Sequence, residues 1–367
     1  MTKKKGTMAE TISDDLQQLD IEDDCLGGRA NPPAPELPPS QKARKKKTES
    51  TRAHLKLMDA AAEIALDRPT EDDAAYIARE LVQCTLPHKN PGNVTLWRRT
   101  NGNLTLAIQP GINIQTGDSY GYPYGTIPRL LLFWITTEAV QTRKRRLEFG
   151  NSLAGFMHKL GLSAYTGGGP CGDAKRLREQ MQRLFNARIS FHRDLSRTVT
   201  AKDGTTEQQH GTAWMNMEVA PEGELWWDVK NPYQAALWGS WIELGDKFFR
   251  AITAAPVPVD VRALRALKRS PLALDLYAWL THEAYRAYKS KEGRFVAWSP
   301  LMEQLGAEYN TQKNFSAAAR AALRKVAAVY PSLNLGSLRA GVRIQPESFP
   351  AIQPRERVTL DLKPSRD

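Results

Sequence analysis

The sequence predicts an α+β fold: two tandem winged helix-turn-helix domains, related by a weak internal repeat and preceded by a disordered basic N-terminal arm. Three observations predict it. Amphipathic helical patterns are interspersed with short runs of alternating polarity, one pattern recurs 145 residues further along the chain, and basic residues concentrate around one short helix.

The N-terminal region divides into two parts. Residues 1–52 are polar and proline-rich and end in "KARKKKTESTR", so they lack the apolar residues of a core and we expect a disordered arm. Its lysines would either add nonspecific DNA affinity or only solubilise the chain. Residues 53–92 have apolar residues at three- and four-residue steps in "AHLKLMDAAAEIALD" and "EDDAAYIARELVQCTL", which predicts a helical extension.

The internal repeat is the most informative feature. "WITTEAV" at Trp134–Val140 matches "WLTHEAY" at Trp279–Tyr285, and "FMHKLG" at Phe156–Gly161 matches "LMEQLG" at Leu301–Gly306 at the same offset. The apolar stripe of a third helix keeps this register, since Leu177, Met181, Leu184 and Phe185 fall on Ala322, Val326, Val329 and Tyr330. We infer two copies of one unit.

Both copies follow one plan. In the first, a long helix begins near Pro128, a short helix ends at Gly161, and a basic helix follows with Asp173 as its N-cap. Alternating strands come next, around a turn at Asp203-Gly204. This is the order of a winged helix-turn-helix domain, in which the third helix enters the major groove and the hairpin lies against the DNA backbone.

The plan sets the domain boundaries. We predict a first winged-helix domain over residues 93–255, a second over 256–350 and a C-terminal tail over 351–367. In the first domain, Asn101-Gly102 predicts a type I′ hairpin turn. The glycine-rich "YTGGGPCGD" before the basic helix is expected to be a loose turn, mobile until DNA binds.

Charge indicates the class of partner. The formal net charge is +11, so an acidic polymer is a natural partner. Between residues 129 and 193, twelve Lys and Arg residues accompany four acidic residues, which places a net charge of +8 in this segment. A merely solvated surface would spread the excess more evenly, and the concentration therefore predicts nucleic-acid binding.

Side-chain direction on the third helix gives candidate DNA contacts. The residues predicted to contact base edges are Arg178, Gln182 and Asn186. Those predicted to contact phosphates are Lys175, Arg176, Arg183, Arg193 and Arg197. The outward residues in the second copy are Lys313, Asn314, Arg320, Arg324 and Lys325. The second helix is less basic, so it would contact phosphates weakly or contact protein.

The sequence has no motif of a nucleotide-binding, metal or catalytic site. A phosphate loop needs Lys-Ser/Thr after its last glycine, and Asp173-Ala174 stands there instead. No two of the six histidines are closer than 18 residues, and the three cysteines are far apart. We expect no cofactor, no metal and no catalysis. We find neither a signal peptide nor an apolar run of membrane-spanning length, so we expect a cytoplasmic protein.

Three segments carry a resemblance to a known family. "YGYPYGTIPRLLLFWITTEAV", "LEFGNSLAGFMHKLGL" and "RLREQMQRLFNARISF" resemble the plasmid-encoded RepA-type (theta, iteron-binding) replication initiators, specifically over about residues 120–260 and more loosely across the second copy. The resemblance implies a bacterial protein without intrinsic catalysis. Such a protein binds repeated double-stranded origin sequences (iterons), opens an adjacent AT-rich segment and recruits the host initiator and replicative helicase.

Two alternative functions stay open at this point. One is a sequence-specific transcriptional repressor, although two fused DNA-reading domains suit a monomer on a long asymmetric repeat better. The other is a nucleic-acid enzyme such as a primase, nuclease or nickase, which the missing acidic and histidine clusters disfavour. Self-dimerisation is also possible on the sequence, whereas neither a membrane nor a small-molecule substrate is expected as a partner.

Overall fold

The computed structural model describes residues 54–67, 69–70, 73–163, 172–200, 206–226, 239–306 and 309–352. The predicted N-terminal arm, most of the glycine-rich turn and most of the predicted C-terminal tail lie outside the described residues. Within the described ranges, no helix combines the length and apolar character needed to cross a membrane.

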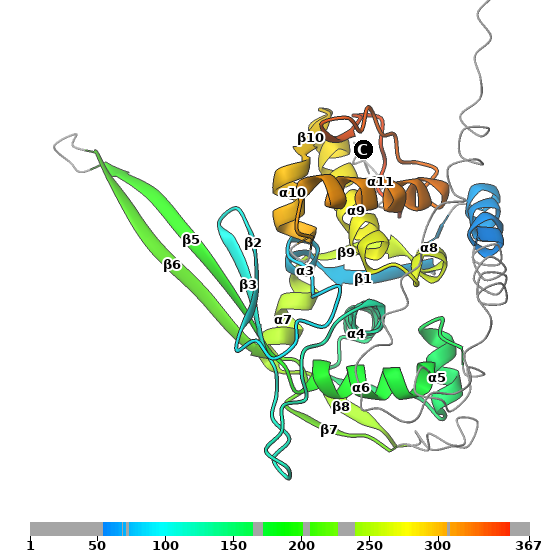
Figure 1. The fold of residues 1–367 in the computed structure, drawn as a ribbon, viewed down its shortest axis with the longest axis vertical. Coiled ribbons are helices and arrows are strands. Elements are labelled where there is room, and N and C mark those ends of the chain that lie inside the picture. Colours follow the sequence, from blue (N-terminus) through cyan, green and yellow to red (C-terminus); the bar gives the residue numbers. More distant parts are fainter. Residues whose placement is uncertain are drawn as a thin grey trace, which may run out of the picture.

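Two units with one order of elements make up most of the fold (Figure 1). Each has a long helix, a short strand, a short helix and a third helix, followed by strands that return to the first strand. The first unit comprises α4 (Thr126–Thr142), β4 (Arg146–Glu148), α5 (Leu153–Lys159), α6 (Asp173–Phe185), β7 (Glu222–Glu224) and β8 (Trp241–Glu243). The second unit comprises α9 (Pro271–Ser290), β10 (Arg294–Ala297), α10 (Trp298–Leu305), α11 (Gln312–Ala328) and β11 (Gly341–Ile344).

The small sheets of the two units share one strand order. In the first unit the order is β4-β8-β7, so the earliest strand pairs with the last one. In the second unit β10 pairs with β11 in the same way. An isolated bridge joins Ile344 of β11 to Leu335, which takes the place of β7. The repeat therefore extends from the helices to the strand pairing.

The helices keep the predicted offset of 145 residues. α4 begins at Thr126 and α9 at Pro271, while α5 begins at Leu153 and α10 at Trp298. The register is interrupted between these pairs, because α9 has 20 residues and α4 has 17. Both long helices end before a left-handed residue, Arg143 or Lys291, each with φ of 57°. The spacing from the start of the long helix to the start of the short one is the same in both units, so the longer α9 is followed by a shorter connection to α10.

A larger sheet combines two strands that precede the first unit with two strands inserted between α6 and β7, and its strand order is β2-β3-β5-β6. Its strands are β2 (Trp97–Asn101), β3 (Leu104–Gln109), β5 (Arg188–Thr200) and β6 (Thr206–Glu218). The predicted β2–β3 hairpin is confirmed, but its turn is different: Asn101 pairs with Leu104, so the central residues are Gly102 and Asn103. Gly102 has φ of 57° and Asn103 does not have positive φ, which fits type II′ rather than type I′.

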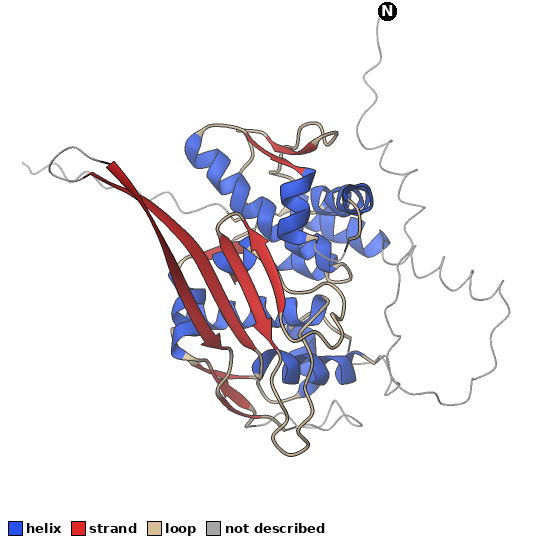
Figure 2. Ribbon diagram, turned by 60° about the vertical axis from the view of Figure 1, so that its left-hand side comes forward, coloured by secondary structure: helices blue, strands red, loops and turns tan. Residues whose placement is uncertain are grey.

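The strands after α6 differ from the prediction in their partner. We predicted that they form the hairpin of the first unit, whereas β5 pairs with β3 of the larger sheet. The reason is that Ile189 and Phe191 lie opposite Ile108 and Leu106 on one buried face. Beyond the residues that pair with β3, β5 and β6 continue as a two-stranded hairpin that extends away from the rest of the protein (Figure 2).

The N-terminal extension is only partly helical. Residues 54–66 form the first predicted helix. The second predicted helix is wrong over Ala74–Ala78, which form strand β1, and only α3 (Arg79–Gln83) is helical. β1 pairs with β9 (Pro256–Asp260), and the gain from this pairing with a segment about 180 residues away overrides the local helical pattern. Two further helices flank β9, α7 (Asp246–Ala254) and α8 (Val261–Leu267).

The long helices of the two units meet in the centre of the molecule. α6 packs against α4, α4 against α9, and α9 against α11, so one continuous hydrophobic core runs through both units. Figure 1 shows α6 and α11 on opposite sides of the α4–α9 pair. Each third helix therefore has one face against a long helix and another face available to solvent.

Candidate nucleic-acid interface

The buried face of α6 fixes which of its side chains point outward. Leu177, Met181 and Leu184 have no exposed surface and recur at steps of four and three residues. Lys175, Arg176 and Arg178 are exposed, as predicted from this periodicity. Arg176 also lies 3.7 Å from a carboxylate oxygen of Asp173, an ion pair too exposed to fix the guanidinium firmly. α6 thus presents three cations to solvent along its N-terminal half.

The polar side chains in the C-terminal half of α6 are partly buried or occupied by contacts within the protein. Gln182 is half-buried, and Asn186 is exposed but donates from Nδ2 to the Gln182 carbonyl oxygen at 2.8 Å. Arg183 is half-buried, with its guanidinium 5.1 Å from the centre of the Tyr124 ring. The buried Gln180 accepts a hydrogen bond from Tyr124 N at 3.0 Å. Arg183 and Gln180 therefore hold the segment before α4 against α6.

The N-terminus of α6 differs from the prediction. Asp173 is the first helical residue and Gly172 takes the N-cap position, without a capping side chain. The Asp173 carboxylate accepts a hydrogen bond from Ser163 N at 3.2 Å. This bond connects the segment that follows α5 with the start of α6. The helix begins one residue earlier than an Asp173 N-cap would place it, and Asp173 is the acidic residue of its first turn.

The two candidate arginines of β5 lie on one face of the sheet. Arg193 is half-buried and stands opposite Leu104 of β3 and Ala213 of β6. Arg197 is exposed in the extended part of the β5–β6 hairpin, where its Nε donates to Gln209 Oε1 at 3.0 Å. Both guanidinium groups therefore belong to the larger sheet and not to the small sheet of the first unit.

The candidates on α11 divide into two groups. Lys313 and Asn314 are exposed in the first turn, after Thr311, whose hydroxyl accepts from Asn314 N at 3.2 Å. Arg324 and Lys325 are half-buried, and burial lowers the pKa of the Lys325 ammonium. The exposed polar group of α11 is therefore its first turn, six residues earlier than the start of α6 in the repeat register.

Arg320 is held in a structural role. Its Nε donates to Leu338 O at 3.2 Å and its Nη2 to Arg339 O at 3.3 Å, while the guanidinium lies 5.0 Å from the centre of the Trp298 ring. These contacts connect α11 with α10 and with the segment before β11. Sequence reasoning placed this side chain outward because it considered one helix without the strand segment that packs on it.

Two cations of the second unit were missed from the sequence. Arg339 and Arg343 are exposed, and the Arg343 guanidinium lies 5.0 Å from the centre of the Phe295 ring. Both belong to "SLRAGVRI", where basic residues precede and enter β11. Reading the hairpin as carefully as the helix would have found them.

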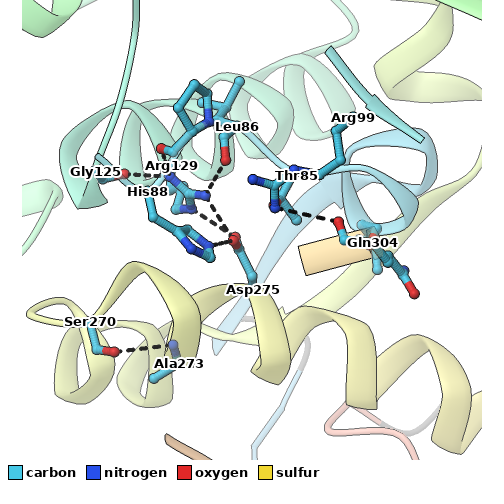
Figure 3. Close-up of polar contacts among 12 residues, drawn as sticks. Thr85, Leu86, His88, Arg99, Gly125, Arg129, Ser270, Ala273, Asp275 and Gln304 are labelled. Carbon is cyan, nitrogen blue, oxygen red and sulfur yellow. Dashed lines mark hydrogen bonds and ion pairs between the residues drawn. The ribbon is translucent and has the colours of Figure 1, made fainter. Parts of the chain in front are cut away.

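The local charge is smaller at the surface than the count implied, because Arg129 is buried (Figure 3). It is 4% exposed and donates to both Asp275 carboxylate oxygens, from Nε and Nη2, each at 2.8 Å. It also donates to the carbonyl oxygens of Leu86, Pro87 and Gly125. This cation belongs to the interior and adds little to the field at the surface.

Asp275 also contacts a buried histidine. His88 Nε2 lies 2.7 Å from its second carboxylate oxygen. Burial alone would raise the pKa of Asp275, but the Arg129 guanidinium and the hydrogen bonds from His88 and Arg129 outweigh it and hold the pKa well below its usual range. Asp275 therefore stays ionised inside the core, between α4 and α9.

The comparison with known families agrees with the resemblance predicted from the sequence. Residues 122–299 match the model of a family described as plasmid encoded RepA protein. The match spans α4, α5 and α6 of the first unit and reaches the beginning of α10 in the second. No curated protein and no solved structure matches the chain.

Proposed function

We propose that the chain, a RepA-type plasmid replication protein by its family match, initiates replication by binding repeated origin sequences through two winged-helix domains. In this proposal α6 enters the major groove of the first half of a repeat and the first turn of α11 enters the second. Host initiator and replicative helicase are recruited to the complex, and the protein itself does no chemistry.

The observation that carries the proposal is the shared strand order of the two units. A winged helix pairs the strand before its second helix with the last strand of its wing, and both β4-β8-β7 and β10-β11 follow this rule. The first domain then differs from the predicted one in its wing. β7 and β8 form the wing, and the β5–β6 hairpin is an insertion between the third helix and the wing.

The exposed cations of α6 support DNA as the ligand. Lys175, Arg176 and Arg178 are exposed on the sides of α6 that the buried stripe of Leu177, Met181 and Leu184 leaves open, and a helix this narrow fits the major groove, which is about 12 Å wide. In the proposal Arg178 contacts base edges, where Arg makes paired hydrogen bonds to guanine. Lys175, near the helix start, neutralises a phosphate.

The second unit would read DNA differently. Lys313 and Asn314 are exposed at the start of α11, whereas the middle of that helix is occupied by contacts of Arg320 within the protein. Arg339 in the adjoining hairpin would contact the sugar–phosphate backbone. We therefore expect fewer base contacts from the second unit than from the first.

The test is a two-step DNA-binding experiment. Purified full-length protein selects duplexes from a random-sequence pool, and the enriched sequence is footprinted, alongside the DNA that flanks the gene, at two salt concentrations. The proposal expects regularly spaced protection that persists at the higher salt. Protection that is irregularly spaced and is lost at the higher salt concentration would indicate nonspecific binding by a basic surface and contradict the proposal.

The same DNA separates the alternative functions. Regularly spaced copies in the plasmid's origin support an initiator, whereas a single operator at a promoter would favour a repressor. A magnesium-dependent cleavage or primer product on this DNA would favour an enzyme instead.

A further inference from the structure

A short hairpin after β3 projects beside α6. We call residues 111–119 the finger. An antiparallel bridge joins Ile112 to Ser119, Asn113 N donates to Asp118 O at 2.8 Å, and Gly117 N donates to Asn113 O at 2.8 Å. Tyr120 N closes the base on Gly111 O at 2.9 Å. The first and last of these hydrogen bonds form the bridge, and the second closes the turn, so the segment is a defined hairpin.

The base of the finger is fixed to the C-terminal end of α6. Gly111 lies so close to Asn186 that an added Cβ would come within 2.3 Å of Asn186 O and 2.5 Å of Asn186 Cβ. At the other strand of the base, Gly121 has φ of 78° and lies against the Arg183 guanidinium. The base of the finger therefore packs directly on the end of α6, and this contact sets the direction of the finger relative to the proposed reading helix.

The tip of the finger exposes apolar side chains, and the one charged residue of the finger is Asp118, which is exposed. Ile114 is 97% exposed, the highest value among the large apolar side chains of the described residues, and Ile112 is 64% exposed. Asn113 and Gln115 flank Ile114, and the finger contains no basic residue. In both ribbon views the finger extends from the body, and in Figure 1 it points to the side of α6 that faces away from α4. Its tip thus projects toward the space that DNA would occupy on α6.

We propose that the finger enters the minor groove next to the major groove occupied by α6, with Ile114 inserted between two base pairs as a wedge. The inference rests on the proposed function. Proteins that kink DNA from the minor groove insert apolar side chains such as Ile and use Asn and Gln to contact base edges there. The tip supplies the apolar side chain and the two amides. The Arg and Lys side chains that such proteins also use are absent from the finger, which carries Asp118, so the proposal leaves the phosphate contacts to Lys175 and Arg176 of α6.

The dimensions fit this placement. α6 has 13 residues and is about 20 Å long, so its C-terminal end lies about 10 Å from its middle. From Gly111 to Ile114 the hairpin extends about 10 Å further, at about 3.3 Å per residue. Adjacent major and minor grooves lie about half a helical turn apart, roughly 17 Å. The two lengths together give a maximum reach of about 20 Å from the middle of α6, which is long enough for the tip to enter the next groove.

The wedge predicts where in the site the DNA deforms. Inserting a side chain unstacks a base step, and pyrimidine–purine steps unstack at least cost. We expect the duplexes selected by the wild-type protein to contain such a step at a fixed distance from the bases that α6 reads. Insertion should also kink the duplex by about 20–90°.

The test compares Ile114→Gln with Leu66→Gln in the full-length protein. Leu66 is 88% exposed on the helix of residues 54–66, so both substitutions replace an exposed apolar side chain and neither should affect folding. The probe is the duplex selected by the wild-type protein, with a dye at each end for bending and 2-aminopurine at the flexible step for unstacking. Affinity is measured on the same duplex.

The expected result is specific to the finger. Wild type and Leu66→Gln bend the duplex and raise the 2-aminopurine signal, whereas Ile114→Gln loses most of both and binds roughly five- to tenfold more weakly. An unbent wild-type complex, or equal bending by Ile114→Gln, overturns the wedge and leaves the proposed function standing. Altered self-association of Ile114→Gln with unchanged bending would also overturn it. If the wild type selects no sequence at all, the proposed function itself fails.

Discussion

Arg129 and Asp275 form a two-point ion pair in the interior, with Nε–Oδ1 and Nη2–Oδ2 distances of 2.8 Å each. Arg129 lies near the N-terminus of α4 and Asp275 near that of α9, the two helices that hold equivalent places in the repeat. The pair joins the halves of the protein that we propose to contact successive parts of one DNA site. Its geometry therefore bears on the relative position of the two units.

Removal of Asp275 should destabilise the whole molecule. Asp275→Ala leaves the Arg129 guanidinium buried without its carboxylate, which costs about 3–5 kcal/mol of unfolding free energy in urea titrations. The control is Asp246→Ala, which breaks the exposed Asp246–Arg250 pair and should cost less than about 1 kcal/mol. Equal effects of the two substitutions would show that the buried pair does not stabilise the contact between the units.

A second buried carboxylate gives stability a pH dependence. Glu283 is 5% exposed and is bonded to Arg286 and Arg294. Burial opposes ionisation, but hydrogen bonds from His282 and Arg294 outweigh it and lower the pKa of Glu283 from 4.5 to about 2. Since the folded pKa is the lower one, this stabilisation is present above pH 4.5 and is lost as the pH falls toward 2.

The variant Glu283→Gln isolates this contribution. It should be less stable than wild type at pH 7, because Arg294 loses its carboxylate, and its unfolding free energy should fall less steeply between pH 4.5 and pH 2. Urea titrations at several pH values measure both slopes. Parallel slopes would assign the acid sensitivity to other groups, of which Asp275 is the first to examine.

The sequence predicted the helices of both units because their apolar side chains follow one helical period over long stretches. Leu177, Met181 and Leu184 gave both the buried face of α6 and, by exclusion, the exposed Lys175 and Arg178. An internal repeat strengthened this inference, since each helix was seen twice in one register. Local patterns of this kind survive in the structure because packing reinforces them.

Long-range contacts could not be predicted in the same way. The sequence pattern of Ala74–Ala78 predicts a helix, but these residues form β1 because they pair with Pro256–Asp260. Periodicity likewise predicts a surface position for Arg320, whose guanidinium in fact donates to the main-chain oxygens of Leu338 and Arg339. Arg129 was counted as a surface charge because nothing near it in sequence identifies Asp275 as its partner. In each case the deciding group is distant in the chain, where periodicity carries no information.

Two substitutions on α6 should separate base reading from phosphate binding. Arg178→Ala should cost about 1–3 kcal/mol of binding free energy on the selected duplex and relax preference at one base position. Lys175→Ala should weaken binding to all sequences alike and reduce the slope of log affinity against log salt by about one. Competition assays at several salt concentrations measure both.

The matched control for these cations is Arg250→Ala on α7, because its side chain is 77% exposed and lies outside the proposed interface. It should leave affinity, base preference and salt slope unchanged. If Lys175→Ala and Arg178→Ala behave like this control, α6 does not contact DNA and the placement of the reading helix is wrong.

Arg320 and Lys313 should behave oppositely, although both were predicted to contact DNA. Arg320→Ala removes hydrogen bonds to Leu338 O and Arg339 O, so it should lower the unfolding free energy by about 1–3 kcal/mol. Lys313→Ala should leave stability within about 0.5 kcal/mol and weaken DNA binding. Thermal unfolding beside a binding titration separates these effects, and a fully stable Arg320→Ala variant with weakened binding would instead make Arg320 a DNA contact.

The contact between Gly111 and Asn186 should govern the direction of the finger. A Cβ at Gly111 would meet main-chain atoms of Asn186 at 2.3 and 2.9 Å, so Gly111→Ala must displace either the finger or the end of α6. We expect a loss of about 1–3 kcal/mol in unfolding free energy, as for other overpacked positions. Gly211→Ala is the control, because its nearest neighbour would be Leu195 Cβ at 3.9 Å and it should be nearly neutral.

Because Gly111→Ala leaves Ile114 in place, reduced DNA bending by this variant would show that the wedge needs its orientation as well as its side chain. Undiminished bending would mean that the finger finds the groove without the support of α6.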